Sequence, residues 1–116
     1  MTTYTGGCHC GKVRYEVDAE ISSVISCNCS HCSMKGLLLT FVPIDSFRLL
    51  SGEDSLTEYR FNKKVIEHVF CKECGVQPFA YGVDKDGNRM ATINIRCLDG
   101  VNIEEIPATV FDGRSY

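Results

Sequence analysis

The chain has 116 residues, of which 44% are hydrophobic and 23% are charged, and its formal net charge at pH 7 is −3. This composition is ordinary for a soluble globular protein, and the length predicts one domain over residues 1–116 with a core of modest size. The negative balance argues against general binding of nucleic acid or of anionic membranes, and no apolar stretch approaches the roughly 20 residues that a membrane span needs.

The predicted elements are short strands. Strict alternation over residues 12–17 predicts a half-buried strand with Val13, Tyr15 and Val17 on the buried face. Further strands are predicted at 21–26, 37–42, 47–50, 56–61, 65–70, 78–81, 90–98 and 108–111, with turns at 62–64 and 84–88. No segment shows helical periodicity over a useful length. We therefore predict a mainly β, mostly antiparallel domain.

Eight cysteines occur in this short chain. The first seven residues have neither the charged nor the apolar region of a secretory signal, so we expect a cytoplasmic protein, in which disulfides are rare. The clusters C-x-C and C-x2-C are moreover typical of metal sites. The alternative is a disulfide framework in a secreted domain that has lost its signal.

Four of these cysteines form two pairs far apart in the sequence, Cys8 with Cys10 and Cys71 with Cys74. Four thiolates satisfy a zinc ion completely, which predicts a closed, structural site that ties the N-terminal segment to the middle of the chain. The alternatives are buried free cysteines and a four-thiolate iron–sulfur cluster.

The remaining cluster is Cys27, Cys29 and Cys32, spaced C-x-C-x2-C. Three ligands leave one position of a four-coordinate zinc open, as in catalytic sites. The sequence alone also allows a closed site completed by His31, His68 or Cys97, and a redox motif is a further alternative.

None of the three candidate fourth ligands is favoured by its position. His31 directly precedes Cys32, and adjacent ligands rarely face one ion. His68 falls within a predicted strand. Cys97 shares the predicted strand face of Ile93 and Ile95, so we interpret it as a core cysteine.

Five segments together resemble the glutathione-dependent formaldehyde-activating enzyme family, which also contains centromere protein V. The resemblance covers nearly the whole chain, and seven cysteines at three matching spacings make it specific. The segments are Gly7-Cys8-His9-Cys10-Gly11-x-Val13-Arg14-Tyr15, Cys27-Asn28-Cys29-Ser30-x-Cys32, Phe70-Cys71-x-x-Cys74-Gly75, Asn94-x-Arg96-Cys97-Leu98-Asp99 and Phe111-Asp112-Gly113-Arg114.

The resemblance implies a β-rich, Mss4-like fold with a structural zinc on the outer cysteine pairs and a second, open zinc on the trio. It implies a carbon–sulfur lyase that acts on S-(hydroxymethyl)glutathione, or on glutathione plus formaldehyde, with Cys27, Cys29 and Cys32 as catalytic residues. The expected partner is a small thiol, glutathione, with Lys35, Arg89 and Arg96 as candidates for binding its carboxylates. The alternatives are a zinc-stabilised binding module, a glutathione carrier without catalysis and a protein with two closed zinc sites.

Overall fold

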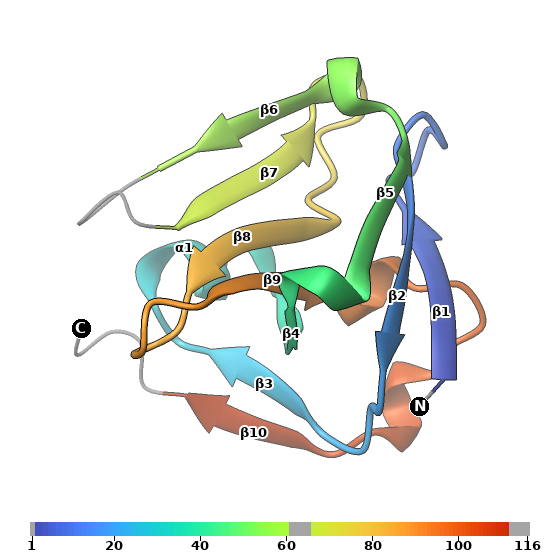
Figure 1. The fold of residues 1–116 in the computed structure, drawn as a ribbon. Helices are drawn as coiled ribbons and strands as arrows, with labels where there is room; N and C mark the ends of the chain where they lie inside the picture. Colours follow the sequence, from blue (N-terminus) through green and yellow to red (C-terminus); the bar gives the residue numbers. More distant parts are fainter. Residues whose placement is uncertain (1, 61–65, 112–116) are drawn as a thin grey trace.

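Strands dominate the fold of this chain. A computed structural model describes residues 2–60 and 66–111 (Figure 1). The strands are β1 (Thr2–Gly7), β2 (Arg14–Ala19), β3 (Val24–Cys27), β4 (Leu38–Pro43), β5 (Phe47–Ser51), β6 (Leu56–Tyr59), β7 (Glu67–Cys71), β8 (Phe79–Val83), β9 (Arg89–Asn94) and β10 (Ala108–Phe111). The helices are α1 (Ser30–Lys35) and the 3-10 turns η1 (Ile44–Ser46), η2 (Glu53–Ser55), η3 (Ile95–Cys97) and η4 (Ile103–Glu105).

These strands form two sheets. The smaller has the order β1-β2-β5, and the larger has the order β10-β3-β4-β9-β8-β7-β6. Every pair is antiparallel except β10 with β3, which are parallel. The mainly β, mostly antiparallel architecture is therefore as predicted.

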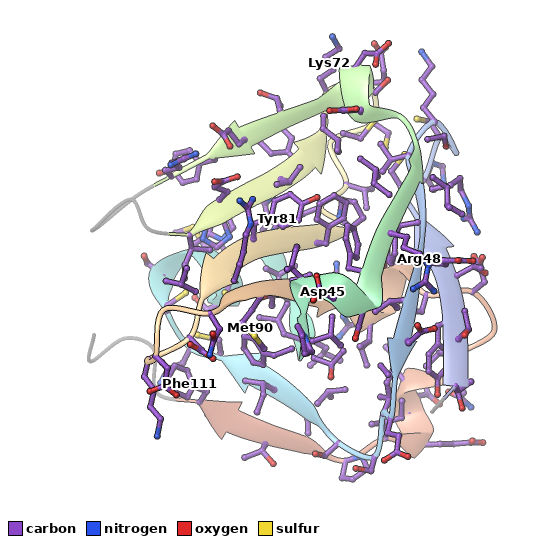
Figure 2. All side chains as sticks on the ribbon, in the orientation of Figure 1. Asp45, Arg48, Lys72, Tyr81, Met90 and Phe111 are labelled. Carbon is purple, nitrogen blue, oxygen red and sulfur yellow. The ribbon has the colours of Figure 1, made fainter. Side chains whose placement is uncertain are left out.

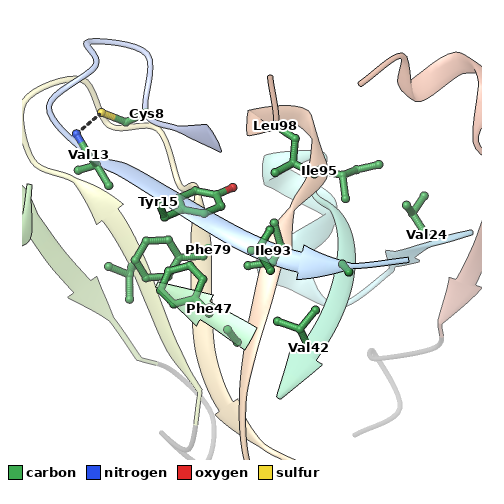
Figure 3. Close-up of a cluster of buried hydrophobic side chains, with 14 of the residues drawn as sticks. Cys8, Val13, Tyr15, Val24, Val42, Phe47, Phe79, Ile93, Ile95 and Leu98 are labelled. Atoms are coloured by element: carbon green, nitrogen blue, oxygen red, sulfur yellow. Dashed lines mark hydrogen bonds between the residues drawn. The ribbon is translucent and has the colours of Figure 1, made fainter. Parts of the chain in front are cut away.

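The core lies between the two sheets (Figure 3). The predicted buried face of residues 12–17 is confirmed, because Val13, Tyr15 and Val17 are all fully buried. The Tyr15 ring meets the Phe79 ring edge-on, with centroids 5.7 Å apart, and its hydroxyl donates a hydrogen bond to the carbonyl of Pro78 at 3.4 Å. The Phe47 ring packs on Phe79 at 4.7 Å, so aromatic contacts join the small sheet to the large one.

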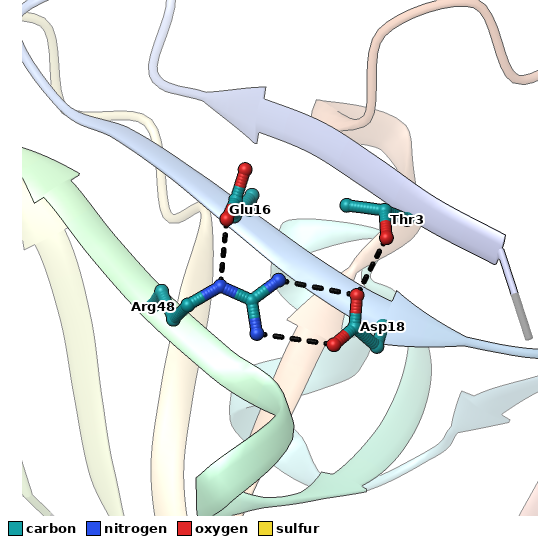
Figure 4. A network of polar contacts seen from close by, with 4 residues as sticks. All are labelled: Thr3, Glu16, Asp18 and Arg48. Atoms are coloured by element: carbon teal, nitrogen blue, oxygen red, sulfur yellow. Dashed lines mark hydrogen bonds and ion pairs between the residues drawn. The ribbon is translucent and has the colours of Figure 1, made fainter.

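A polar network lies across the smaller sheet (Figure 4). The Arg48 guanidinium on β5 donates to Glu16 at 2.7 Å and to both carboxylate oxygens of Asp18 at 3.0 and 3.1 Å. The Thr3 hydroxyl on β1 donates to the same Asp18 carboxylate at 2.7 Å. The Arg48 and Thr3 donors lower the pKa of Asp18 to about 2. This network therefore connects all three strands through side chains.

Helix α1 corrects the expectation that the chain lacks helices. It has six residues, which is too short for a hydrophobic period to be visible in the sequence. It begins after Cys29, whose sulfur accepts a hydrogen bond from the N–H of Cys32, and it ends at Gly36. Gly36 has φ of 66°, a left-handed conformation that glycine adopts without steric cost.

One predicted strand and one unpredicted strand are further differences between expectation and structure. The strand predicted for 90–98 ends at Asn94, whose side-chain oxygen accepts a hydrogen bond from the N–H of Arg96 at 3.2 Å and so starts the turn η3. Strand β1 was not predicted, because most of its side chains are exposed. The turn predicted at 62–64 lies outside the described residues, whereas the turn at 84–88 is present.

Candidate metal centres

The outer cysteine pairs lie together in the fold. Cys8 and Cys10 belong to the loop after β1, Cys71 ends β7, and Cys74 lies in the turn that follows β7. The four sulfur atoms all lie within 4.8 Å of one another, with 3.5 Å between Cys8 and Cys10 and 3.7 Å between Cys10 and Cys71. Zinc–sulfur bonds of about 2.3 Å at tetrahedral angles require sulfur separations of about 3.8 Å. The residues therefore fit a four-thiolate zinc.

Backbone N–H groups donate hydrogen bonds to two sulfurs of this cluster, those of Cys8 and Cys74. The N–H of Val13 donates to the Cys8 sulfur at 3.4 Å, and the N–H of Val76 lowers the pKa of the Cys74 thiol to about 6. The turn itself closes through Gly75, whose N–H donates to the carbonyl of Cys71 at 2.7 Å. Donors directed at sulfur favour the thiolate form that a metal binds.

The trio is assembled at the junction of β3 and α1. Cys27 ends β3, Cys29 is the N-cap of α1, and Cys32 lies within the helix. Their three sulfur atoms lie within 4.8 Å of one another. The parallel strand β10 reaches the same place, because the carbonyl of Phe111 accepts a hydrogen bond from the N–H of Asn28 at 3.0 Å. All eight cysteines of the chain are free thiols.

The three thiols of the trio ionise unequally without a cation. Burial raises the pKa of Cys32 and of Cys27. Burial also raises the pKa of Cys29, but the N–H of Cys32 and the neighbouring thiols outweigh it, so that this pKa is lowered. One thiolate thus forms first and disfavours ionisation of the others. A bound cation offsets this repulsion, which is why the cluster fits a metal ion.

The other candidate ligands do not join the trio. Within the described part of the chain, its metal-ligand group contains sulfur atoms alone. The ring of His31 lies 4.0 Å from the ring of His68, and His68 is buried on β7, where its Nδ1 is 3.4 Å from Nε2 of Gln77. Burial lowers the pKa of His68 to about 4, so this imidazole is neutral at pH 7.

Cys97 lies outside both clusters. The sequence analysis placed Cys97 on a strand face with Ile93 and Ile95. This placement is wrong, because β9 ends at Asn94 and Cys97 belongs to η3. Its thiol donates to the carbonyl of Gln77 at 3.7 Å and accepts from the Asn94 amide at 3.5 Å. It is a half-buried, hydrogen-bonded cysteine.

The sequence model of the family described as "Glutathione-dependent formaldehyde-activating enzyme" matches residues 3–111. The chain belongs to this family. This match confirms the resemblance carried by the cysteine spacings. The structure is also similar to the crystal structure of a Rhodobacter sphaeroides protein, a structural genomics target, with a TM-score of 0.78 and 29% sequence identity. That similarity covers 90% of this chain and 99% of the other.

For a family named after glutathione, the positions of the three candidate cations matter. Lys35, on the last turn of α1, donates to Oε1 of Gln77 at 2.9 Å and lies 5.0 Å from the centroid of the Phe70 ring. Arg96 donates to the carbonyl of Gly36 at 3.0 Å, so it also contacts the end of α1. Arg89 lies over the Tyr81 ring at the opposite end of β9 from Asn94.

Gln77 is a residue that the sequence analysis did not single out. Its side chain contacts Lys35 and His68, and its carbonyl accepts from Asn94 and Cys97. It follows the outer cluster by three residues and reaches the helix of the trio. An isolated glutamine carries no motif, so no pattern in the sequence could have identified it.

No described helix has both the length and the apolar character needed to span a membrane. The exposed side chains are of both kinds, polar such as Lys72, which follows β7, and apolar such as Phe111 at the end of β10 (Figure 2).

Proposed function

We propose that this chain is a zinc-dependent enzyme of the carbon–sulfur lyase type that forms or splits S-(hydroxymethyl)glutathione, with Cys27, Cys29 and Cys32 as its catalytic metal ligands. The observation that carries this proposal is a compact group of three sulfur atoms with no fourth protein ligand among the described residues. Cys8, Cys10, Cys71 and Cys74 would hold a second, structural zinc. Both belong to one domain over residues 1–116, which we expect to work in the cytoplasm.

The zinc of the trio would supply one kind of chemistry, stabilisation of an incoming thiol as its thiolate near neutral pH. The chain's own residues hold the three sulfurs in place: Cys29 through its N-cap bond and Cys32 through burial against Leu37 and Leu39. Because the trio supplies three ligands, a four-coordinate zinc held there would have one position left for a small molecule. We favour thiol capture over a metal hydroxide, because three thiolates already make the ion a weak Lewis acid.

The reaction is an addition in one direction and an elimination in the other. The glutathione sulfur bonds to the formaldehyde carbon while the carbon–oxygen π bond breaks, and the thiol proton ends on the new hydroxyl group. No oxidant or reductant is needed. Because the two reactants combine spontaneously, the protein contributes by placing the thiolate beside the aldehyde and removing the cost of bringing them together.

The test is the rate of exchange between glutathione, formaldehyde and their adduct, measured by NMR above the uncatalysed rate. The zinc-loaded protein should accelerate exchange, and Cys32→Ser should lose this acceleration. Cys97→Ser is the matched control, since it removes a thiol that lies outside both clusters. A zinc-loaded protein that binds glutathione without accelerating exchange would be a carrier, and the lyase proposal would be wrong.

A further inference from the structure

One ligand of the cysteine trio, Cys32, shares a face of α1 with a cation, Lys35. Cys32 and Lys35 are three residues apart in α1, which puts their Cβ atoms roughly 5–6 Å apart along one side of a helix. Arg89, by contrast, starts β9, whose far end, Asn94, pairs with Leu39 just after α1. Lys35 is therefore a candidate for contacting what the trio binds, and Arg89 is not.

Lys35 is an exposed residue, but two contacts orient its side chain. Its ammonium donates to Oε1 of Gln77 at 2.9 Å and lies over the Phe70 ring. Gln77 is itself buried, and its amide nitrogen lies 3.4 Å from Nδ1 of His68. These contacts fix the direction of the ammonium, and an ordered cation loses less entropy when it binds a ligand.

Among the described residues, no carboxylate balances the charge of Lys35. Each contact of its ammonium is neutral, an amide oxygen and an aromatic face, and no carboxylate within residues 2–60 and 66–111 forms an ion pair with it. An ammonium has three donors, and the Gln77 oxygen uses one. The remaining two can donate hydrogen bonds to an anionic group.

The trio itself needs such a partner if its ligand is anionic. Zn²⁺ with three thiolates has a formal charge of about −1, and a fourth thiolate makes it more negative. A thiol that also carries carboxylates is therefore repelled unless a cation lies nearby.

We propose that Lys35, oriented by Gln77 and Phe70, binds a carboxylate of the incoming thiol and so selects a carboxylate-bearing thiol over a neutral one. This inference rests on the proposed function of the trio and names the part of the substrate that the site recognises. Lys35 is a specificity residue: it touches the substrate at its carboxylate and not at sulfur.

Isothermal titration of the zinc-loaded full chain tests this proposal with three thiols: glutathione, its diethyl ester and 2-mercaptoethanol. The wild-type chain should bind glutathione more tightly than the ester. Lys35→Met should weaken glutathione binding about tenfold, the scale of one lost charged hydrogen bond. It should not weaken binding of the two thiols that lack carboxylates, of which the ester keeps its basic amino group. Lys35→Arg should restore most of the loss.

Two further variants distinguish a direct contact between Lys35 and the thiol from an effect of the protein's net charge. Arg89→Met makes the same change in net charge far from α1 and should leave all three affinities as they are. Gln77→Glu keeps Lys35 but gives its ammonium a carboxylate inside the protein, so glutathione should again bind more weakly while the ester does not. Zinc content and thermal unfolding of each variant show whether it is folded.

The outcomes distinguish this inference from the proposed function. Equal losses for glutathione and for the two thiols without carboxylates in Lys35→Met would show that Lys35 only supports the helix or the metal, and would overturn the inference. Unchanged glutathione affinity would overturn it too. A wild-type chain that binds none of the three thiols would overturn the proposed function as well, whereas tight binding without discrimination would overturn the inference alone.

Discussion

The sulfur of Cys29 accepts a hydrogen bond from the backbone N–H of Cys32 at 3.3 Å, so a proposed metal ligand is also the N-cap of α1. Cys32, the next ligand, lies inside the helix that this bond begins. Formation of the helix therefore also brings two of the three proposed ligands together. A metal at the trio should stabilise α1, and loss of the cap should loosen both.

The first prediction separates these two roles of Cys29. Cys29→Ser should lose one zinc equivalent and keep α1, because serine is among the best N-cap residues. Cys29→Ala should lose the same zinc and, in addition, about 1 kcal/mol of unfolding free energy. Zinc content by atomic emission and denaturant unfolding would measure both effects. Equal stability of the two variants would contradict the capping role.

The second prediction concerns the outer cluster. Cys74→Ser removes one of four proposed ligands that connect segments about 60 residues apart in sequence, and structural zinc contributes on the order of 10 kcal/mol in small domains. We expect no soluble protein with a cooperative unfolding transition. A Cys74→Ser variant that unfolds at the wild-type temperature would show that the assignment is wrong.

The third prediction is that the two proposed zinc ions differ in how firmly they are held. The trio supplies three protein ligands and the outer cluster four. Mild chelation should therefore remove one zinc equivalent while the fold survives, and excess glutathione should slow this loss by mass action. Circular dichroism beside a chelator titration would check it. Simultaneous loss of both ions would contradict an open site.

The fourth prediction concerns Cys97. Cys97→Ala should retain both zinc equivalents and cost on the order of 1 kcal/mol, from lost packing and the lost contact to the Gln77 carbonyl. Metal content and chemical denaturation are the measurements. Loss of a zinc equivalent would place Cys97 among the ligands after all.

The fifth prediction tests the network of the smaller sheet. Arg48→Met should lower the melting temperature, since Arg48 connects Glu16 and Asp18. Because these groups are partly exposed to solvent, the difference from wild type should shrink in 1 M salt, where the screening length falls to about 3 Å. A difference that does not depend on salt would point to lost packing instead of lost charge.

All strands but β1 follow from the sequence, at least in part, because their signal is local. Val13, Tyr15 and Val17 alternate with charged residues, and that period alone predicts which face is buried. Helix α1 was not predicted, because its six residues form fewer than two turns and show no hydrophobic period. The end of β9 escaped it because the cap at Asn94 depends on one side-chain hydrogen bond.

The two candidate ligand sets also follow from the sequence, since ligand type and spacing are properties of short segments. Counting ligands was enough to group the outer two pairs into a set of four and to leave a set of three. In the fold, the sulfur atoms of each set lie within 4.8 Å of one another. What surrounds the trio depends on tertiary structure alone. Lys35 meets Gln77 across 42 positions of sequence, and Phe111 reaches Asn28 only because β10 lies parallel to β3. Such contacts join segments that only the folding of the whole core brings together, so no local pattern encodes them.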